Sequence, residues 1–123
     1  MAFSTVVWIV SGLLAAMYFM SGLTKILRPA KMQATNRTLG AVSEPGLRAI
    51  GAAEVLGAIG VIVPPAVDVL SWVAVLAAGG LAMIQLLAIP RHVRNHERQP
   101  LPFNSLLLAM ALFVLLARSG AIP

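Results

Sequence analysis

Four long apolar runs separated by short polar segments dominate the chain. They cover residues 2–24, 47–63, 69–90 and 102–118, and charged side chains are nearly absent from them. A helix needs about 20 apolar residues to cross a bilayer, with a tolerated range of about 17–25. The runs also lack the alternating units of about ten residues that mark barrel strands. We therefore predict an all-α fold, a four-transmembrane-helix bundle that forms a single membrane domain over residues 1–123.

Composition agrees with a membrane protein and excludes several functions. Of the 123 residues, 59% are hydrophobic and 11% are charged, whereas soluble domains are about 45–50% apolar and about 25% charged. The chain has no Cys, which excludes disulfides and thiolate metal sites. Nucleic-acid binding is not expected, because the basic residues offer no continuous face. The first run has no basic segment before it and is long enough to span, so we interpret it as a retained helix and not as a signal peptide.

Basic residues in the connections predict the orientation. The second connection, Pro64–Asp68, has no basic residue. The first and third connections hold Lys25, Arg28, Lys31 and Arg37, and Arg91, Arg94 and Arg98, respectively. Cytoplasmic loops of membrane proteins carry an excess of Lys and Arg. We therefore expect a multi-pass membrane protein with both termini outside. Arg118 is the basic residue on the outer side, where it either departs from this rule or has a local role.

The second run carries a carboxylate, Glu54, several residues inside the apolar stretch. At helical spacing it shares a face with Gly51, Gly57 and Ala58. Small residues on one face allow a neighbouring membrane helix to approach closely. A charged residue at the centre of a membrane helix costs about 2.5–3.5 kcal/mol on insertion scales, so it is usually paired, protonated or in a polar cavity. We therefore expect this face to point into the bundle.

Polar residues from all four runs fall at one depth, in the predicted cytoplasmic half. A rise of about 1.5 Å per residue gives this set: Tyr18, Lys25, Glu54, Gln85 and Asn104. Two interpretations stay open. In the first, the residues form a pocket open to the cytoplasm or inner leaflet, with Glu54 at its base and Tyr18 and Gln85 in its wall. In the second, Lys25 pairs with Glu54, and Gln85 and Asn104 satisfy each other or the backbone as interhelical contacts.

The remaining candidates are weaker. Arg48 and Arg118 are expected to be further polar anchors of the site. His92 and His96 are four residues apart and would meet on a helical turn to bind metal or haem, but a solvated loop is the favoured interpretation of this proline-bounded segment, and no metal site is predicted. Trp8 falls near the outer end of the first run and fits an aromatic belt.

Two glycine motifs and their polar neighbours carry a family resemblance. The first lies within Tyr18–Leu27 and contains Gly22 and Lys25. The second lies within Arg48–Pro64 and contains Gly51, Glu54 and Gly57. Asn104 and Arg118 bracket the last run, and His92 follows the third. In these features the chain resembles the DoxX-like family of small four-helix bacterial membrane proteins. Some relatives are associated with membrane redox systems, including a thiosulfate:quinone oxidoreductase subunit and an oxidative-stress complex with superoxide dismutase and a thiosulfate sulfurtransferase. The resemblance therefore implies a redox association and a location in the bacterial inner membrane.

Three functions remain open. We favour an accessory or binding subunit that holds a small hydrophobic, quinone-like ligand or docks a redox partner protein. It would have no intrinsic cofactor, and a quinone or lipid would be its bound molecule. Membrane lipid is an expected partner, and homo-oligomerisation is left open. The second function is a small proton-coupled transporter with Glu54 as the carrier acid. The third is an intramembrane enzyme that uses Glu54 as acid or base, although no nucleophile, metal cluster or cofactor motif is visible.

Overall fold

The helical bundle predicted from the apolar runs is present in the computed structural model, which describes residues 2–122. Four helices are long and apolar enough to cross a membrane: α1 (Ala2–Leu27), α4 (Glu44–Val67), α5 (Val73–Arg94) and α6 (Leu101–Ser119). Two short helices, α2 (Pro29–Gln33) and α3 (Arg37–Gly40), lie in the connection between α1 and α4. Over residues 2–122 the structure contains no strand, so the all-α prediction is confirmed.

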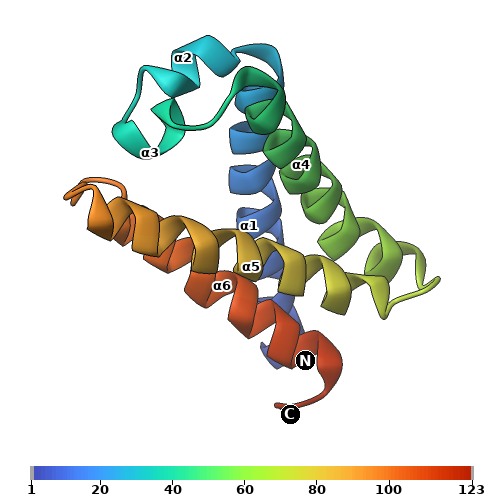
Figure 1. Ribbon diagram of the computed structural model, residues 1–123. Helices are drawn as coiled ribbons and strands as arrows, with labels where there is room; N and C mark the ends of the chain where they lie inside the picture. Colours follow the sequence, from blue (N-terminus) through green and yellow to red (C-terminus); the bar gives the residue numbers. More distant parts are fainter. Residues whose placement is uncertain (1, 123) are drawn as a thin grey trace.

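The long helices form two antiparallel pairs that cross each other (Figure 1). Helices α1 and α4 make the closest pair, α5 and α6 make the second, and the packing of α4 on α5 joins the two. The start of α1, the end of α6 and the turn at residues 68–72 lie at one end of the bundle, which we call the terminal end. Helices α2 and α3 and the α5–α6 connection lie at the other, which we call the loop end.

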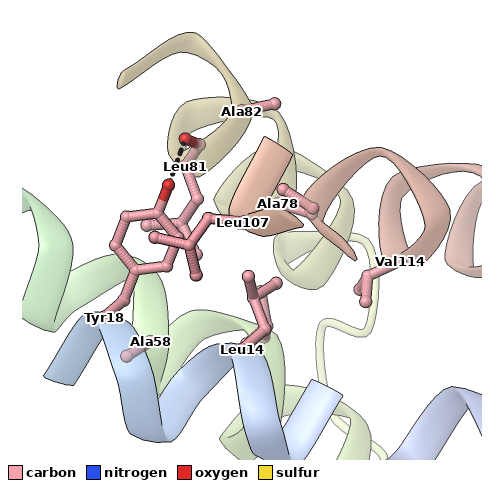
Figure 2. Packing of buried hydrophobic residues seen from close by; sticks show 10 residues of the cluster. Leu14, Tyr18, Ala58, Ala78, Leu81, Ala82, Leu107 and Val114 are labelled. Carbon is pink, nitrogen blue, oxygen red and sulfur yellow. Dashed lines mark hydrogen bonds between the residues drawn. The ribbon is translucent and has the colours of Figure 1, made fainter. Parts of the chain in front are cut away.

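The core forms where the two pairs cross (Figure 2). Its buried members are mostly small or branched: Leu14, Tyr18, Ala58, Val61, Ala78, Leu81, Ala82, Leu107, Ala111 and Val114. Large apolar side chains cover the outside of the bundle. Leu56 on α4 is 68% exposed and Leu76 on α5 is 64% exposed. A surface of this kind suits hydrocarbon, where helices satisfy their own backbone groups and need no polar coat.

Glycines set how closely the helices approach. A Cβ atom added to Gly22 of α1 would lie 2.5 Å from the backbone oxygen of Gly51 on α4. The reverse holds as well, because a Cβ on Gly51 would clash with the backbone oxygen of Gly22. Further along α4, a Cβ on Gly57 would lie 2.5 Å from Cδ2 of Leu81 on α5. The small face predicted around Glu54 is therefore the contact face of α4 with both α1 and α5.

The helix boundaries differ from the apolar runs at several prolines. Helix α4 continues through Pro64 and Pro65 to Val67, where a turn was expected from residue 64 on. A proline removes one backbone hydrogen bond, and membrane helices tolerate this where neighbouring groups satisfy the freed carbonyls. The helix instead ends at Val67, followed by Asp68 in a left-handed conformation (φ 54°). The N–H of Asp68 donates to the carbonyl oxygen of Pro65 at 3.3 Å, and the N–H of Val69 donates to that of Pro64 at 3.2 Å.

Helix α5 is shifted along the chain relative to its apolar run. It begins at Val73 and not at residue 69, because residues 68–72 form the turn after α4. At its other end it passes through Pro90 and continues to Arg94. His92 therefore lies on a helix and is buried, with 5% of its surface exposed. The expectation that this segment is a solvated loop was wrong for His92.

Candidate functional site

The crossing of α1 and α4 places a buried ion pair at the middle of the loop-end half. One turn beyond Gly22, Lys25 extends toward Glu54, which lies one turn beyond Gly51. Lys25 Nζ lies 2.7 Å from Glu54 Oε1, and the two side chains are 11% and 2% exposed. The pair predicted between these residues is present. The close glycine contact explains it, because it brings the two helix backbones near enough for direct contact between the charges.

Ser21 completes this cluster. Its hydroxyl accepts a hydrogen bond from Lys25 Nζ at 2.8 Å and faces the Glu54 carboxylate, with Oγ 3.3 Å from Oε2 and 3.4 Å from Oε1. Ser21 lies one turn before Lys25 on the same face of α1, so its place beside the lysine follows from helical spacing. Its contact with Glu54, 33 residues away, depends on the helix crossing.

A cleft of about 490 Å³ opens beside this cluster. Ser21 lines it and is thus shared between the cleft and the ion pair. The other lining residues come from α1, α2 and the start of α6, and most are apolar: Ala16, Met17, Met20, Thr24, Met32 and Phe103. Methionine side chains adapt to ligands of irregular shape and make favourable contacts with aromatic rings. The arrangement suits a flat apolar molecule with a polar group at the end nearest Ser21.

Tyr18 and Gln85 form a second buried polar contact between helices. The Tyr18 hydroxyl donates to the carbonyl oxygen of Leu81 at 2.9 Å (Figure 2) and accepts from Gln85 Nε2 at 2.8 Å. Tyr18 is 0% exposed and Gln85 is 4% exposed. The Oε1 atom of Gln85 is buried with no hydrogen-bond partner in the described part of the chain. These residues tie α1 to α5, and neither is among the residues that line the cleft beside Ser21.

Three predicted site residues lie away from the ion pair. Arg48 is exposed, and its Nε bonds the carbonyl oxygen of Ile26 at 3.3 Å, near the end of α1. Asn104 is half-buried in the first turn of α6, and its side chain makes no hydrogen bond within residues 2–122. In the described part of the chain, the side chains of Gln85 and Asn104 therefore bond neither each other nor the backbone, so this part of the second interpretation was wrong. Arg118 lies at the terminal end, where Cζ of its guanidinium is 4.6 Å from the centre of the Trp8 ring.

A third polar cluster holds α3 against the end of α5, and it was not foreseen. Glu97 accepts hydrogen bonds from the backbone N–H of Arg37 at 2.6 Å and the hydroxyl of Thr38 at 2.6 Å. It also contacts His92 Nδ1 at 2.7 Å. Partial burial opposes ionisation of Glu97, but the hydrogen bonds from Thr38, His92 and the α3 backbone lower its pKa to about 2. The one signal in the sequence was an acid alone in a basic connection.

The clusters give no support for a metal centre. In the described part of the chain, no group of three or more His, Asp or Glu side chains is placed to hold a metal ion. His92 contacts Glu97, while His96 follows in a turn with a left-handed backbone (φ 57°). The two histidines therefore have different surroundings, although they are four residues apart.

Comparison with known proteins identifies the family. No curated protein and no solved structure gives a significant match to the chain. The model of the DoxX-like family matches residues 9–114, which include all four long helices in whole or in large part. The match covers both glycine motifs and the Lys25–Glu54 pair. Together with the four spanning helices, it makes the chain a multi-pass membrane protein, and the chain belongs to the DoxX-like family.

Proposed function

We propose that the protein binds a small hydrophobic molecule with a polar end, of the quinone type, in the cleft beside Ser21. One observation carries the proposal: the cleft is apolar except near Ser21, whose hydroxyl also contacts the buried Lys25–Glu54 pair. A polar group that enters the cleft would therefore meet a hydroxyl already oriented by two opposite charges. Ligand sites in proteins commonly combine an apolar lining with a few placed polar groups.

The chemistry of the lining fits a quinone ring. The Ser21 hydroxyl has one hydrogen, which points to the Glu54 carboxylate over a long contact of 3.3–3.4 Å. On binding it would turn to a ring carbonyl, while Oγ would keep the hydrogen bond from the Lys25 ammonium, which strengthens the new bond. Met17, Met20 and Phe103 would contact the ring faces and edges. The chain has no Cys and no group of metal ligands within its described residues, so electrons would pass between the bound molecule and a partner. The protein would then act as an accessory subunit of a membrane redox system.

The proposal includes a location in the membrane. Basic residues are concentrated at the loop end, around α2, α3 and the α5–α6 connection. The positive-inside rule then puts the loop end in the cytoplasm and both chain ends outside, with the bacterial inner membrane as the compartment. The cleft would open in the inner leaflet, where a membrane-dissolved ligand could enter sideways.

The transporter and enzyme functions remain alternatives to this proposal. Both require Glu54 to exchange protons with a substrate or with water during function. Glu54 is 2% exposed, and its carboxylate is held by Lys25 and Ser21. A binding subunit needs no movement of this pair, which is why we favour it.

The test is a binding measurement with matched cleft variants. The full chain is placed in lipid nanodiscs and titrated with a short-chain benzoquinone, and binding is followed by calorimetry. We expect Ser21→Ala and Phe103→Ala to weaken binding by about tenfold, the loss of one hydrogen bond or one ring contact. Phe19→Ala is the control, because Phe19 is similarly exposed (41%, against 49% for Phe103) but lines a different cleft.

The titration, a proton-flux assay and a turnover assay together decide between the three functions. Equal binding by the parent, Ser21→Ala and Phe103→Ala would contradict the cleft assignment. Proton flux into liposomes that contain the parent chain, lost in Glu54→Gln, would favour the transporter instead. Turnover of a membrane-soluble substrate, lost in the same variant, would favour the enzyme.

A further inference from the structure

A second cleft, at the terminal end, carries two charged side chains that form no ion pair among residues 2–122. Its volume is about 660 Å³, and it lies between the end of α4, the start of α5 and the end of α6. Its polar lining consists of Asp68, Ser71, Trp72, Arg118 and Ser119. It lies at the opposite end of the bundle from the Lys25–Glu54 pair, so it is separate from the proposed ligand site.

Arg118 is the unusual residue in this cleft. Its guanidinium stacks on the ring of Trp8 at 4.6 Å. Stacking of this kind engages the face of a cation but gives its N–H groups no acceptor. The Nε and Nη2 atoms are buried with no hydrogen-bond partner in the described part of the chain, while Nη1 is not buried in this way. The guanidinium has therefore lost much of its hydration without gaining a carboxylate partner among residues 2–122.

Asp68 supplies the opposite charge on the same cleft. It is an exposed residue at the end of α4, held in place by the left-handed turn. Asp68 and Arg118 form no ion pair with each other, since the ion pairs of residues 2–122 are Lys25–Glu54 and His92–Glu97. The cleft thus presents one separated cation and one separated anion to whatever enters it.

We propose that this cleft binds a zwitterionic phospholipid headgroup, with the phosphate on Nη1 of Arg118, the guanidinium nitrogen that is not buried, and the amine on Asp68. Guanidinium groups match phosphate oxygens in geometry and charge, and an ammonium group pairs with a carboxylate. Trp72 lines the cleft and Trp8 lies against Arg118, and both are exposed, as is typical of residues at the level of lipid headgroups. A headgroup with phosphate alone would leave Asp68 unpaired and repelled, so the amine is part of the assignment.

The test compares lipids that differ only in their headgroups. Native mass spectrometry of the full chain in detergent measures the binding of phosphatidylethanolamine, phosphatidylglycerol and diacylglycerol with identical acyl chains. We expect the parent to bind phosphatidylethanolamine most tightly. Arg118→Gln should weaken this binding by about tenfold, a loss expected for one charge-assisted contact. Asp68→Asn should retain phosphate binding and lose the preference for the amine headgroup.

Controls test whether the headgroup itself is recognised. Arg98→Gln removes an exposed cation at the loop end and should leave the preference unchanged. Circular dichroism of each variant verifies that the helices are intact, and the headgroup preference of the parent chain tests the site without any substitution. Equal binding of all three lipids by the parent would overturn the proposal. So would displacement of the lipid by inorganic phosphate at comparable concentration, which would indicate a site for free anions.

Discussion

Gly22 of α1 and Gly51 of α4 lie with their backbones in contact, and neither position has room for a Cβ atom. Because the two helices are antiparallel, Lys25, three residues after Gly22, lies beside Gly51, and Glu54, three residues after Gly51, lies beside Gly22. Their side chains meet across this contact, with Nζ 2.7 Å from Oε1. The glycine contact and the ion pair are therefore one structural unit. The glycines set the distance between the two helix backbones, and the ion pair forms because that distance is short. The predictions on α1 and α4 below follow from this relationship.

Enlarging Gly22 should force α1 and α4 apart. In Gly22→Ala the new methyl group would lie 2.5 Å from the backbone oxygen of Gly51, and a backbone atom cannot move aside as a flexible side chain can. We expect a loss of about 1–3 kcal/mol in the free energy of unfolding, the usual cost of overpacking. Unfolding by a denaturing detergent in mixed micelles measures it. Gly12→Ala is the control, because nothing lies within 4 Å of its added methyl, and a similar loss there would contradict the role of the glycine contact.

Removing one partner of the Lys25–Glu54 pair should lower the free energy of unfolding more than removing both partners. Lys25→Met or Glu54→Leu each leaves an uncompensated charge in a buried place, for which we expect about 3–5 kcal/mol of destabilisation. The double variant leaves no charge, so its loss should be smaller than either single loss. Unfolding in the same denaturing detergent gives the free energy of unfolding of the parent, of both single variants and of the double variant, which form a double-mutant cycle. Additive single losses would show that the two charges act independently.

The contact of α3 with the α5–α6 connection should resist acid. The pKa of Glu97 is lowered to about 2, below the value near 4.3 of an unperturbed glutamate. A lowered pKa in the folded state stabilises the contact above the unfolded pKa, and that contribution is lost as the pH falls toward 2. His92, Thr38 and the α3 backbone are the groups that face Glu97. We therefore expect no release of α3 between pH 7 and 5, and progressive release below 4.

This contact can be followed by the distance between spin labels on α3 and on the α5–α6 connection. Glu97→Gln is the matched variant, because it keeps the size of the side chain and removes its charge. It should widen the distance at neutral pH and abolish the dependence on acid. Release of α3 already at pH 6 in the parent chain would contradict the role of Glu97.

Single cysteines should report the orientation without background, because the chain has no Cys. Arg98→Cys lies in the α5–α6 connection at the loop end, and Ser71→Cys lies in the turn at the terminal end, both at exposed positions. With the loop end in the cytoplasm, a membrane-impermeant maleimide added to intact cells should label position 71 and not position 98. The opposite pattern would reverse the proposed topology.

The apolar runs in the sequence predicted the four membrane spans well, but they predicted the ends of α4 and α5 poorly. Helical length and apolar content are properties of one segment, so four spans could be predicted from their composition. The ends of α4 and α5 depend on whether Pro64, Pro65 and Pro90 break the helix. Membrane helices tolerate proline where neighbouring groups satisfy the freed carbonyls, and the pattern of one segment does not contain those neighbours.

The sequence by itself determined the helical class, the four spans, the family features and the close-packed face around Glu54, because spacing along one helix decides which residues share a face. It also pointed to Lys25 as the partner of Glu54. Only the tertiary structure decided that Ser21 joins this pair, that Gln85 bonds Tyr18 and not Asn104, and that Arg118 stacks on Trp8. Those contacts join residues on different helices. They depend on the crossing and rotation of packed helices, which spacing along a single helix does not contain.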